Sequence, residues 1–531
     1  MKTLTTSSVV ALIVLAAAVL LLADFALRGD SPKTRPPLVA GGFYPADPAE
    51  LSRMVDAFLA NAAVAKLEGP PVAIICPHAG YPFSGQVAAH SYVLLKGKKF
   101  ERVVVIAPSH YEAFAFASIY DGDAYATPLG LVPVDKAFAA RLASLSPQIQ
   151  ISGRGHGEVQ GHGEHALEDE LPFLQRVLGE FKLVPIVMGD QNYELCRALG
   201  IALAKAIGNS GTLIVVSSDL SHYHPYDEAV GIDRQTLKAI EEWDYLSLSR
   251  NFETRVWEAC GGGPIIASMI AAERLGAKRA IILKYANSGD VTGDKSRVVG
   301  YGAVALVREK ARTEGKGAGF ALDGKEKDAL LRIARNAVET AVKERKVFEC
   351  SPGGMERLAE ARGAFVTLKR HGELRGCIGY MTPMKSLCMT VRDVAILAAL
   401  QDRRFPQVTE AELGQLEYEI SVLSPLRRVA DIQEIKVGKH GLLIKEGETE
   451  GVLLPQVPTE QGWDRKTFLE EVCLKAGLPK QAWQDEGADL FLFSALVFSE
   501  HSLTGSIKED EQAFPKQRTL PGQRGPNSPQ P

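Results

Sequence analysis

The sequence has few cysteines and a small net charge, and it lacks C-x-x-C and H-E-x-x-H motifs. Seven cysteines are spread over 531 residues and none forms a C-x-x-C pair, which excludes a disulfide framework. The formal net charge is only -4 at pH 7, so no overall basic field attracts nucleic acid, and we expect no nucleic-acid partner. An H-E-x-x-H pair is also lacking, which counts against hydrolytic zinc chemistry.

The N-terminus carries an unbroken apolar run, Val9 to Ala23, after a single lysine. This run has the length of a secretory signal core, and with the uncharged residues before it the segment is long enough to cross a membrane. No favourable small-x-small cleavage site follows the run. We therefore expect residues 1–28 to be an uncleaved signal-anchor, a membrane contact that holds the folded domains outside the cytoplasm. The alternative is a cleaved signal peptide and a secreted or periplasmic protein.

Two folded units separated by linkers are expected in the rest of the chain. After a Pro/Gly linker at 29–45, residues 46–307 alternate short apolar strands with helical stretches. This alternation predicts an α/β unit in which helices cover a mostly parallel sheet. A linker at 308–325 leads to a smaller unit at 326–503, which has fewer such alternations and is predicted to be α+β. The Pro/Gln/Gly-rich end, 504–531, is predicted to be disordered.

The apolar runs and periodic segments of the first unit predict its individual elements. Strands are expected at 72–77, 102–108, 182–189, 212–219, 280–287 and 300–307. Helices are expected at 48–66, 134–145, 165–179, 192–207, 227–247 and 264–275.

Three of these strands are followed by a histidine at the carboxyl end. His78 follows the strand at 72–77, His110 follows 102–108, and His222 follows 212–219. Ligands of open α/β sheets bind outside the carboxyl ends of the strands. We therefore expect the three imidazoles to meet at one edge of the sheet, as a metal site or an acid–base centre.

Cys260 is the candidate thiol ligand, because it stands directly before three glycines and a proline. Glycine lets a backbone approach a ligand closely, although a small buried thiol is the alternative explanation. Two imidazoles and a thiolate suit copper, iron or zinc rather than magnesium or calcium, and they leave positions open for a substrate or dioxygen. His222, with Asp219 three residues before it, would then be a supporting or acid–base group.

Glu164, His165 and Glu168 are further pocket candidates at the start of the predicted helix 165–179. His165 and Glu168 are three residues apart and would share a helix face. The alternative is a solvated acidic first turn that the helix dipole stabilises. His156 and His162 are flanked by glycines and are expected in flexible loops.

The second unit contains the hexamer LRGCIG at 374–379. Arg375, Gly376 and Cys377 combine a cation, a flexible residue and a thiol in what we expect to be a Gly-flanked turn. Such a turn would supply a nucleophile or an anion site. A tight structural turn with a buried cysteine is the equally weighted alternative.

The motifs of the first unit resemble those of the Memo family in order and spacing. They are PHAGYPFSG (77–85), APSHY (107–111), EHALEDELPFL (164–174), SSDLSHY (217–223) and CGGGPI (260–265). The resemblance implies a fold similar to that of class III extradiol dioxygenases, which are non-haem iron enzymes. The chain has Glu170 where animal members have a histidine.

The Memo resemblance also implies a ligand set and a pocket. The ligands would be His78, His110 and Cys260, the pocket would be lined by His222 and Asp219, and the cofactor would be one iron or copper ion, with zinc ranked lower. The dioxygenases have a carboxylate where Cys260 stands, which argues against ring cleavage.

The second unit resembles the AMMECR-type domain over roughly 326–503, through ELRGCIGYM (373–381), DRRFPQVTEAEL (402–413), YEISVLSP (418–425) and the segment 450–483. A chain that carries both families resembles the AmmeMemoRadiSam set, which implies a radical SAM protein as a partner. That protein would be separate, because this chain lacks the C-x₃-C-x₂-C signature.

Two functions are consistent with these patterns. The first is a metal-dependent oxidoreductase or dioxygenase-like enzyme. The second is a non-catalytic, membrane-tethered scaffold whose pocket binds a small molecule or peptide.

Overall fold

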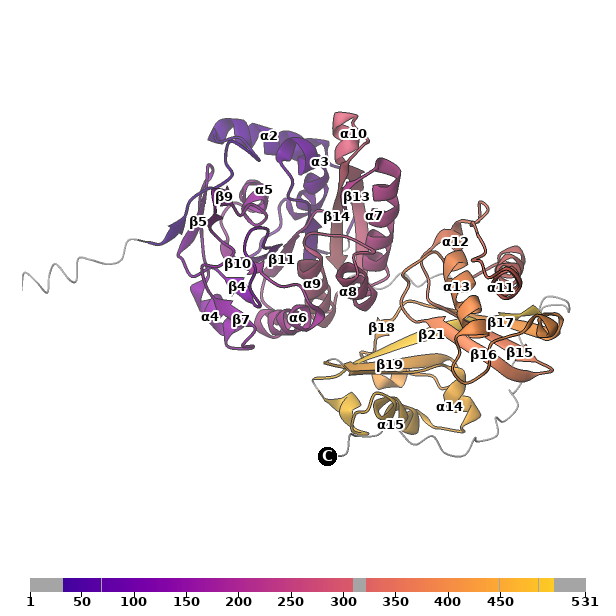
Figure 1. Ribbon diagram of the computed structural model, residues 1–531. Helices are drawn as coiled ribbons and strands as arrows, with labels where there is room; N and C mark the ends of the chain where they lie inside the picture. The colour runs from indigo at the N-terminus through magenta and orange to yellow at the C-terminus, as the bar shows by residue number, and fades with distance from the viewer. Residues whose placement is uncertain (1–31, 68, 309–320, 448, 486, 501–531) are drawn as a thin grey trace, which may run out of the picture. The chain divides into compact units, whose positions relative to one another are not determined.

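The computed structural model describes residues 32–67, 69–308, 321–447, 449–485 and 487–500 (Figure 1). The described residues fall into two units. One is drawn from Met1–Glu241 and Phe252–Arg312, and the other from Glu242–Asn251 and Thr313–Pro531.

A mixed sheet of nine strands, counted over the described residues, forms the middle of the first unit (Figure 1). The strand order is β12-β14-β2-β11-β3-β10-β4-β7, and β13 pairs with β14. The four central strands, β2, β11, β3 and β10, are mutually parallel. The strands are β2 (Ala73–Cys76), β3 (Arg102–Pro108), β4 (Ala117–Ile119), β7 (Ile149–Ile151), β10 (Lys182–Met188), β11 (Thr212–Ser217), β12 (His222–His224), β13 (Arg279–Asn287) and β14 (Val298–Val307).

The expected α/β class is confirmed, with antiparallel strands flanking the parallel centre. β14 runs antiparallel to β2, and β4 runs antiparallel to β10. Every residue of β3 is buried, as expected for a continuous apolar strand in a sheet covered on both sides. Val103, Val105 and Ala107 pack in the core that includes residues of α2, α3 and α5. The alternate residues Val104 and Ile106 are equally buried on the opposite face, where α9 contacts β3.

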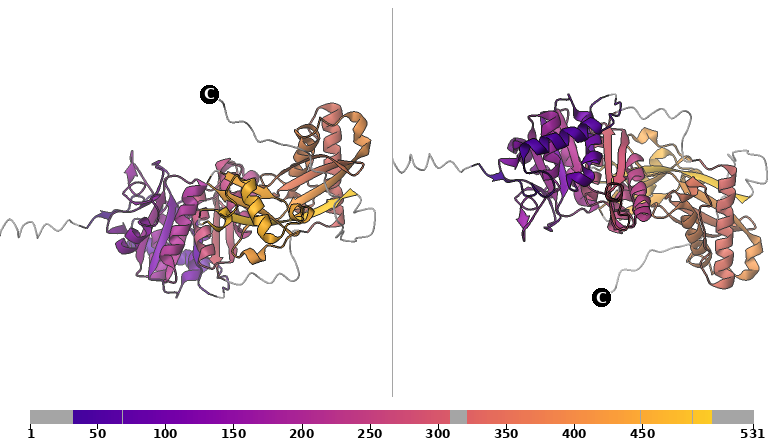
Figure 2. Two further views of the ribbon diagram at one scale, coloured as in Figure 1. Left: turned by 90° about the horizontal axis from the view of Figure 1, so that it is seen from below. Right: turned by 90° about the horizontal axis from the view of Figure 1, so that it is seen from above.

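Helices therefore cover both faces of this sheet (Figure 2). The longer predicted helix at 227–247 is interrupted, because α7 ends at Glu241 and Trp243 has a positive φ of 62°. The helices of the first unit are α2 (Pro48–Asn61), α3 (Tyr81–Tyr92), η1 (Val93–Leu95), α4 (Lys136–Ala143), η2 (Glu168–Glu170), α5 (Leu171–Leu178), α6 (Tyr193–Ile207), α7 (Tyr226–Glu241), α9 (Gly262–Arg274) and α10 (Ser288–Thr292). Most of α8 (Tyr245–Glu253) belongs to the second unit, which includes Glu242–Asn251.

Residues 32–45, expected to belong to a linker, are instead part of the first unit. β1 (Thr34–Arg35) pairs with β5 (Ala124–Thr127), which also pairs with β6 (Gly130–Pro133). Arg35 is 4% exposed. The Pro/Gly composition that is typical of a linker here accompanies an extended segment anchored by a buried arginine. A small hairpin, β8 (Glu158–Val159) with β9 (His162–Gly163), lies further along the chain.

The second unit is built on a seven-stranded antiparallel sheet, counted over the described residues. Its order is β16-β15-β17-β21-β19-β20, and β18 pairs with β21. One core lies between this sheet and α11 and α13, and another involves α15. The strands are β15 (Ala364–Arg370), β16 (Glu373–Tyr380), β17 (Leu416–Leu423), β18 (Arg427–Arg428), β19 (His440–Glu446), β20 (Thr449–Leu453) and β21 (Asp489–Ser499). The helices are α11 (Gly324–Glu344), α12 (Glu356–Ala359), α13 (Leu387–Leu400), η3 (Glu410–Gln415), η4 (Ile432–Glu434), α14 (Gln456–Glu460), α15 (Arg465–Lys475) and η5 (Ala482–Gln484).

The structure corrects the expected membrane-anchored localisation. Over the described ranges, no helix is both long enough and apolar enough to span a bilayer. The 21-residue α11 has the length, but it carries charged side chains such as Lys325, Lys327 and Arg332. The segment 1–28, on which the expectation rested, lies outside the described residues, as does the tail 504–531. The prediction of a membrane anchor is therefore withdrawn.

Candidate metal centre

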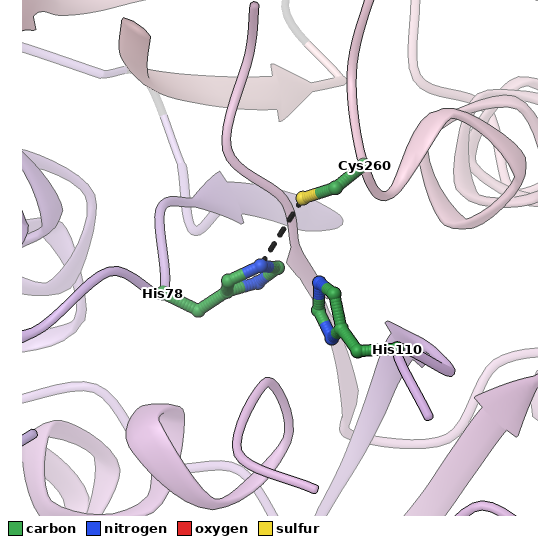
Figure 3. Close-up of side chains that lie close together, drawn as sticks. All are labelled: His78, His110 and Cys260. Carbon is green, nitrogen blue, oxygen red and sulfur yellow. Dashed lines mark hydrogen bonds between the residues drawn. The ribbon is translucent and has the colours of Figure 1, made fainter. Parts of the chain in front are cut away.

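His78, His110 and Cys260 converge at the carboxyl edge of the parallel strands (Figure 3). His78 lies two residues after β2, His110 two residues after β3, and Cys260 two residues before α9. His78 Nε2 is 3.1 Å from Cys260 Sγ, and one donor atom from each residue lies within 4.8 Å of the others. Donors around a tetrahedral ion with bonds of about 2.0–2.3 Å stand about 3.5 Å apart. The separations of the three donor atoms therefore lie around the value that one bound ion requires.

The glycines after Cys260 explain how its thiol reaches the histidines. A Cβ at Gly261 would lie 2.4 Å from the carbonyl oxygen of Ser217, and one at Gly263 would lie 2.8 Å from Gln191 Cβ. A side chain at Gly261 would push the chain away from the end of β11, and one at Gly263 would push it away from Gln191. The side chain of Gln191 also bridges this segment, donating to the Cys260 carbonyl at 2.8 Å and accepting from the Gly263 amide at 2.6 Å.

The thiol of Cys260 is a protonated group in the absence of a cation. Its burial, and next the nearby Asp219 carboxyl, raise its pKa. The backbone amide of Asp219 donates to Sγ at 3.1 Å, while the Cys260 amide donates to the Asp219 carbonyl at 3.2 Å. These contacts fix the sulfur in place, and a positive ion is needed to hold it as a thiolate.

Glu164 orients His110. Its carboxylate accepts from the His110 backbone amide at 2.6 Å and lies 3.0 Å from His110 Nδ1. It also accepts from the amides of His165 and Ala166. Burial alone would raise the pKa of Glu164, but its hydrogen bonds to His110 outweigh burial and lower it. An ionised carboxylate on Nδ1 leaves Nε2 as the lone-pair nitrogen, an arrangement common in metal-binding histidines.

His165 is a third imidazole beside the pair. Its ring stacks on His110 with centroids 4.5 Å apart and meets His78 edge-on at 5.3 Å. Its Nδ1 is buried without a hydrogen-bond partner among the described residues. Burial, then the charge of His110, lower its pKa to about 4, so the ring is neutral at physiological pH. His110, Glu164 and His165 also form a second group of potential ligands.

Asp219 and His222 lie beside the three convergent residues. Asp219 Oδ1 accepts from the backbone amides of His78 at 2.9 Å and Ala79 at 3.4 Å, and burial raises its pKa to about 7. His222 Nδ1 is 2.8 Å from the Leu220 carbonyl. Burial lowers the pKa of His222, and so does the charge of His110.

Glu168 does not share a pocket face with His165. Residues 164–167 are not helical, and η2 begins only at Glu168, so the three-residue spacing does not align the two side chains. Glu168 instead forms a buried ion pair with Arg35 at 2.5 Å. It also accepts from the amides of Leu38 and Val39. It therefore holds the N-terminal segment of the first unit.

His156 is not the flexible loop residue that its flanking glycines predict. It is 1% exposed and contacts the Tyr125 hydroxyl at 2.5 Å through Nδ1. His162 is exposed in the hairpin and stacks on Tyr111.

The LRGCIG segment of the second unit is a strand rather than a turn, because Arg375, Gly376 and Cys377 lie within β16. A Cβ at Gly376 would lie 2.2 Å from the Ala398 carbonyl oxygen, so the glycine permits close packing of α13. Arg375 is engaged by Glu412 at 2.8 Å and by the Pro406 carbonyl at 2.9 Å. Burial raises the pKa of Cys377.

Sequence reasoning overlooked the polar groups behind His78. Ser217 Oγ is 2.8 Å from His78 Nδ1 and 2.6 Å from Glu170 Oε1. Ser217 is the last residue of β11, at the same sheet edge as the end of β2. Its position at the end of a strand was the sequence signal from which a role for Ser217 could have been predicted. In the sequence, Glu170 stands out only because it departs from the motif at 164–174. Its contact with Ser217 depends on how η2 packs and could not be predicted.

Comparisons with known proteins agree with the two-unit architecture. A family model described as Memo-like protein matches residues 35–305, and one described as AMMECR1 matches residues 331–498. A MEMO1 family protein of Methanopyrus kandleri is 38% identical over 287 residues, which are 52% of this chain and 99% of that protein. One from Aquifex aeolicus is 36% identical over 51% of this chain and 97% of its own. A crystal structure of an uncharacterized Pyrococcus horikoshii protein is 40% identical, with a TM-score of 0.33, over 35% of this chain and 97% of that chain.

Proposed function

Because the chain belongs to the Memo family over residues 35–305 and continues into an AMMECR1 domain, we propose that its first domain is a metal-dependent redox or oxygenase-like centre. His78, His110 and Cys260 are the proposed ligands. The observation that carries the proposal is the convergence of these three donors at the carboxyl edge of the parallel strands.

The donor set fits a transition metal. Imidazole and thiolate ligands suit iron, copper or zinc, whereas magnesium and calcium require oxygen ligands. We propose iron or copper, because either supplies one-electron chemistry when bound, and we rank zinc below them. Three protein ligands leave coordination positions for a substrate or dioxygen. The side chain of His110 is 25% exposed, so solvent reaches this edge.

The chain's own residues prepare the donors. Glu164 accepts from His110 and thereby presents the opposite ring nitrogen. Burial holds the pKa of His78 well below its ordinary value, so no proton competes for that imidazole near neutral pH. The thiol of Cys260 releases a proton when a cation binds, so metal uptake should strengthen as pH rises.

Proton transfer is assigned to the groups beside the donors. Asp219, whose pKa burial raises to about 7, exists in both protonation states near neutral pH, which suits an acid or a base. His222 is the second acid–base group, and His165 is a neutral imidazole that contacts both ligand rings. The proposed substrate is a small molecule or a peptide.

The AMMECR1 domain is proposed to serve the same process, because fusion keeps the two domains at a high effective concentration. No nucleophile is assigned to it, since Arg375 is paired with Glu412 and burial raises the pKa of the Cys377 thiol. A separate radical SAM protein remains the proposed partner. Co-purification of the two proteins under anaerobic conditions tests that part.

Elemental analysis of the full chain by plasma mass spectrometry, with electron paramagnetic resonance on the same sample, tests the centre. We expect one iron or copper per chain, and loss of that metal in His78→Ala and His110→Ala with retained secondary structure. His162→Ala, which removes an exposed imidazole of the hairpin, is the matched control and should retain the metal.

Two results would contradict this proposal. Stoichiometric zinc with no paramagnetic signal would replace the redox assignment by a redox-inactive one. A chain that binds no metal above background after either aerobic or anaerobic preparation would remove its basis, and would favour the alternative of a ligand-binding pocket.

A further inference from the structure

A line of buried polar side chains extends from His78 into the protein, on the side opposite Cys260. His78 Nδ1 is 2.8 Å from Ser217 Oγ, and Ser217 Oγ is 2.6 Å from Glu170 Oε1. The hydroxyl of Tyr92 donates to the other oxygen of Glu170. His78, Ser217, Glu170 and Tyr92 are each no more than 2% exposed, so their proton positions are set by one another rather than by bulk water.

The number of hydrogens on Ser217 decides the direction of these bonds. Its single hydroxyl hydrogen faces three neighbours, because Oγ is also 2.5 Å from the Ala166 carbonyl oxygen. A carbonyl can only accept, and two oxygens this close require a hydrogen between them. The hydroxyl therefore donates to Ala166. Its two lone pairs remain, and they face Glu170 and His78.

Glu170 completes the pattern as a neutral acid. Glu170 Oε1 lies 2.6 Å from Ser217 Oγ, and once the serine hydrogen is donated to Ala166, the hydrogen of this contact must come from Oε1, while Oε2 accepts from Tyr92. Burial raises the pKa of Glu170 to about 8, although its hydrogen bonds with Ser217 and Tyr92 oppose the rise. A protonated carboxyl at neutral pH is therefore consistent with the geometry. Even if the serine hydroxyl were donated to Glu170, it would not be available to His78.

In both arrangements His78 Nδ1 meets an oxygen whose hydrogen is used elsewhere. Nδ1 must then carry the hydrogen and donate it, and a neutral imidazole has only one. Nε2, which lies 3.1 Å from Cys260 Sγ, is left with a free lone pair.

We propose that Ser217 and Glu170 are positioning residues, which hold His78 as the Nδ1–H tautomer and so present Nε2 as a metal ligand. The functional role in this inference rests on the proposed metal centre, but the tautomer of His78 is a property of the metal-free chain. Glu164 orients His110 in the same way, because its carboxylate lies against Nδ1 of that ring. The two ligand histidines are thus oriented by different chemical groups, one ionised and one neutral.

The tautomer is measured directly by nitrogen-15 magnetic resonance on metal-free full-length protein labelled at histidine. The signals of His78 are identified by their loss in His78→Gln. We expect a hydrogen on Nδ1 and none on Nε2. A hydrogen on Nε2 in the unaltered chain would overturn the proposal, and this measurement needs no variant at Ser217 or Glu170.

Metal titration of variants tests the consequence. Ser217→Ala removes the acceptor, and we expect both tautomers to become populated and metal affinity to fall by about 10–100-fold, the range typical of such supporting contacts. Glu170→Gln should leave tautomer and affinity unchanged, because its amide donates to Ser217 and accepts from Tyr92 as the neutral acid does. Ser91→Ala is the matched control, since that buried hydroxyl of α3 bonds to the Ile75 carbonyl.

The outcomes separate this inference from the proposed function. An Nδ1–H His78 in a chain that binds no metal supports the hydrogen-bond assignment and overturns the metal centre. An unchanged tautomer and affinity in a folded Ser217→Ala variant overturns the role of Ser217. A weakened affinity in Glu170→Gln, equal to that of Ser217→Ala, overturns the neutral acid at Glu170.

Discussion

Replacing Glu170 by glutamine should change how the stability of the first domain depends on pH. The folded chain holds this carboxyl with a pKa raised from 4.5 to about 8, chiefly by burial. Between these values the folded state keeps a proton that the unfolded state releases. Because the folded state binds more protons there, the stability of the domain falls as pH rises. Glutamine cannot titrate, so Glu170→Gln lacks this loss.

The expected size follows from that interval. Each pH unit between 4.5 and about 8 costs the unaltered chain about 1.4 kcal/mol from this one group. Over the whole interval the cost reaches about 5 kcal/mol. The free energies of unfolding of the two proteins should therefore lie closest near pH 4.5. At pH 8 the free energy of unfolding of the variant should exceed that of the unaltered chain by several kcal/mol more than it does at pH 4.5.

Hydrogen exchange during guanidinium unfolding is the suitable assay, because peptides from β3 and β11 report on the first domain alone. Glu158→Gln, at an exposed position of β8, controls for the loss of one negative charge. A difference between Glu170→Gln and the unaltered chain that stays constant from pH 5 to pH 8 would refute the reasoning. It would mean that Glu170 is ionised in the folded protein.

Three further results are expected. Glu168→Gln should destabilise the first domain by about 3–5 kcal/mol, since it leaves the buried Arg35 without its counter-charge; retained stability in chemical denaturation would contradict this. Cys260→Ser should remove thiolate-to-metal absorption and stoichiometric metal, and a metal content equal to that of the unaltered chain would exclude the thiol as a ligand. Gly376→Ala should lower the stability of the second domain by about 1–3 kcal/mol through overpacking. Gly414→Ala, where nothing lies within 4 Å of the added carbon, should be nearly neutral in the same melting experiment.

The sequence was sufficient to predict the sheet and the edge at which the donors meet. The apolar run 102–108 became β3 with identical bounds, because a strand buried on both faces must be apolar throughout. The positions of His78 and His110 followed from the ends of their strands. The membrane anchor was the wrong prediction, since it rested on local hydropathy at residues 1–28, outside the described residues, and no described helix supports it.

The pocket residues were harder to predict, because their roles depend on contacts between distant segments. Glu164 and Glu168 have the same chemistry and lie in the same motif. One orients His110 and the other neutralises Arg35. The difference arises because the chain is not helical between them, which periodicity does not reveal. The sequence alone leaves Arg375 available for an anion, whereas in the structure Glu412, 37 residues away, pairs with it.

The separation of the donors along the chain has a consequence for biosynthesis. His78 and Cys260 are 182 positions apart, and the thiol is the last of the three proposed ligands to be translated. A nascent chain that has not yet extended past Cys260 holds two imidazoles but no sulfur at this edge, and its sheet still lacks β13 and β14. The full set of proposed ligands thus exists only after translation has passed Cys260. A chain that is still being synthesised therefore presents two of the three proposed donors and an incomplete sheet.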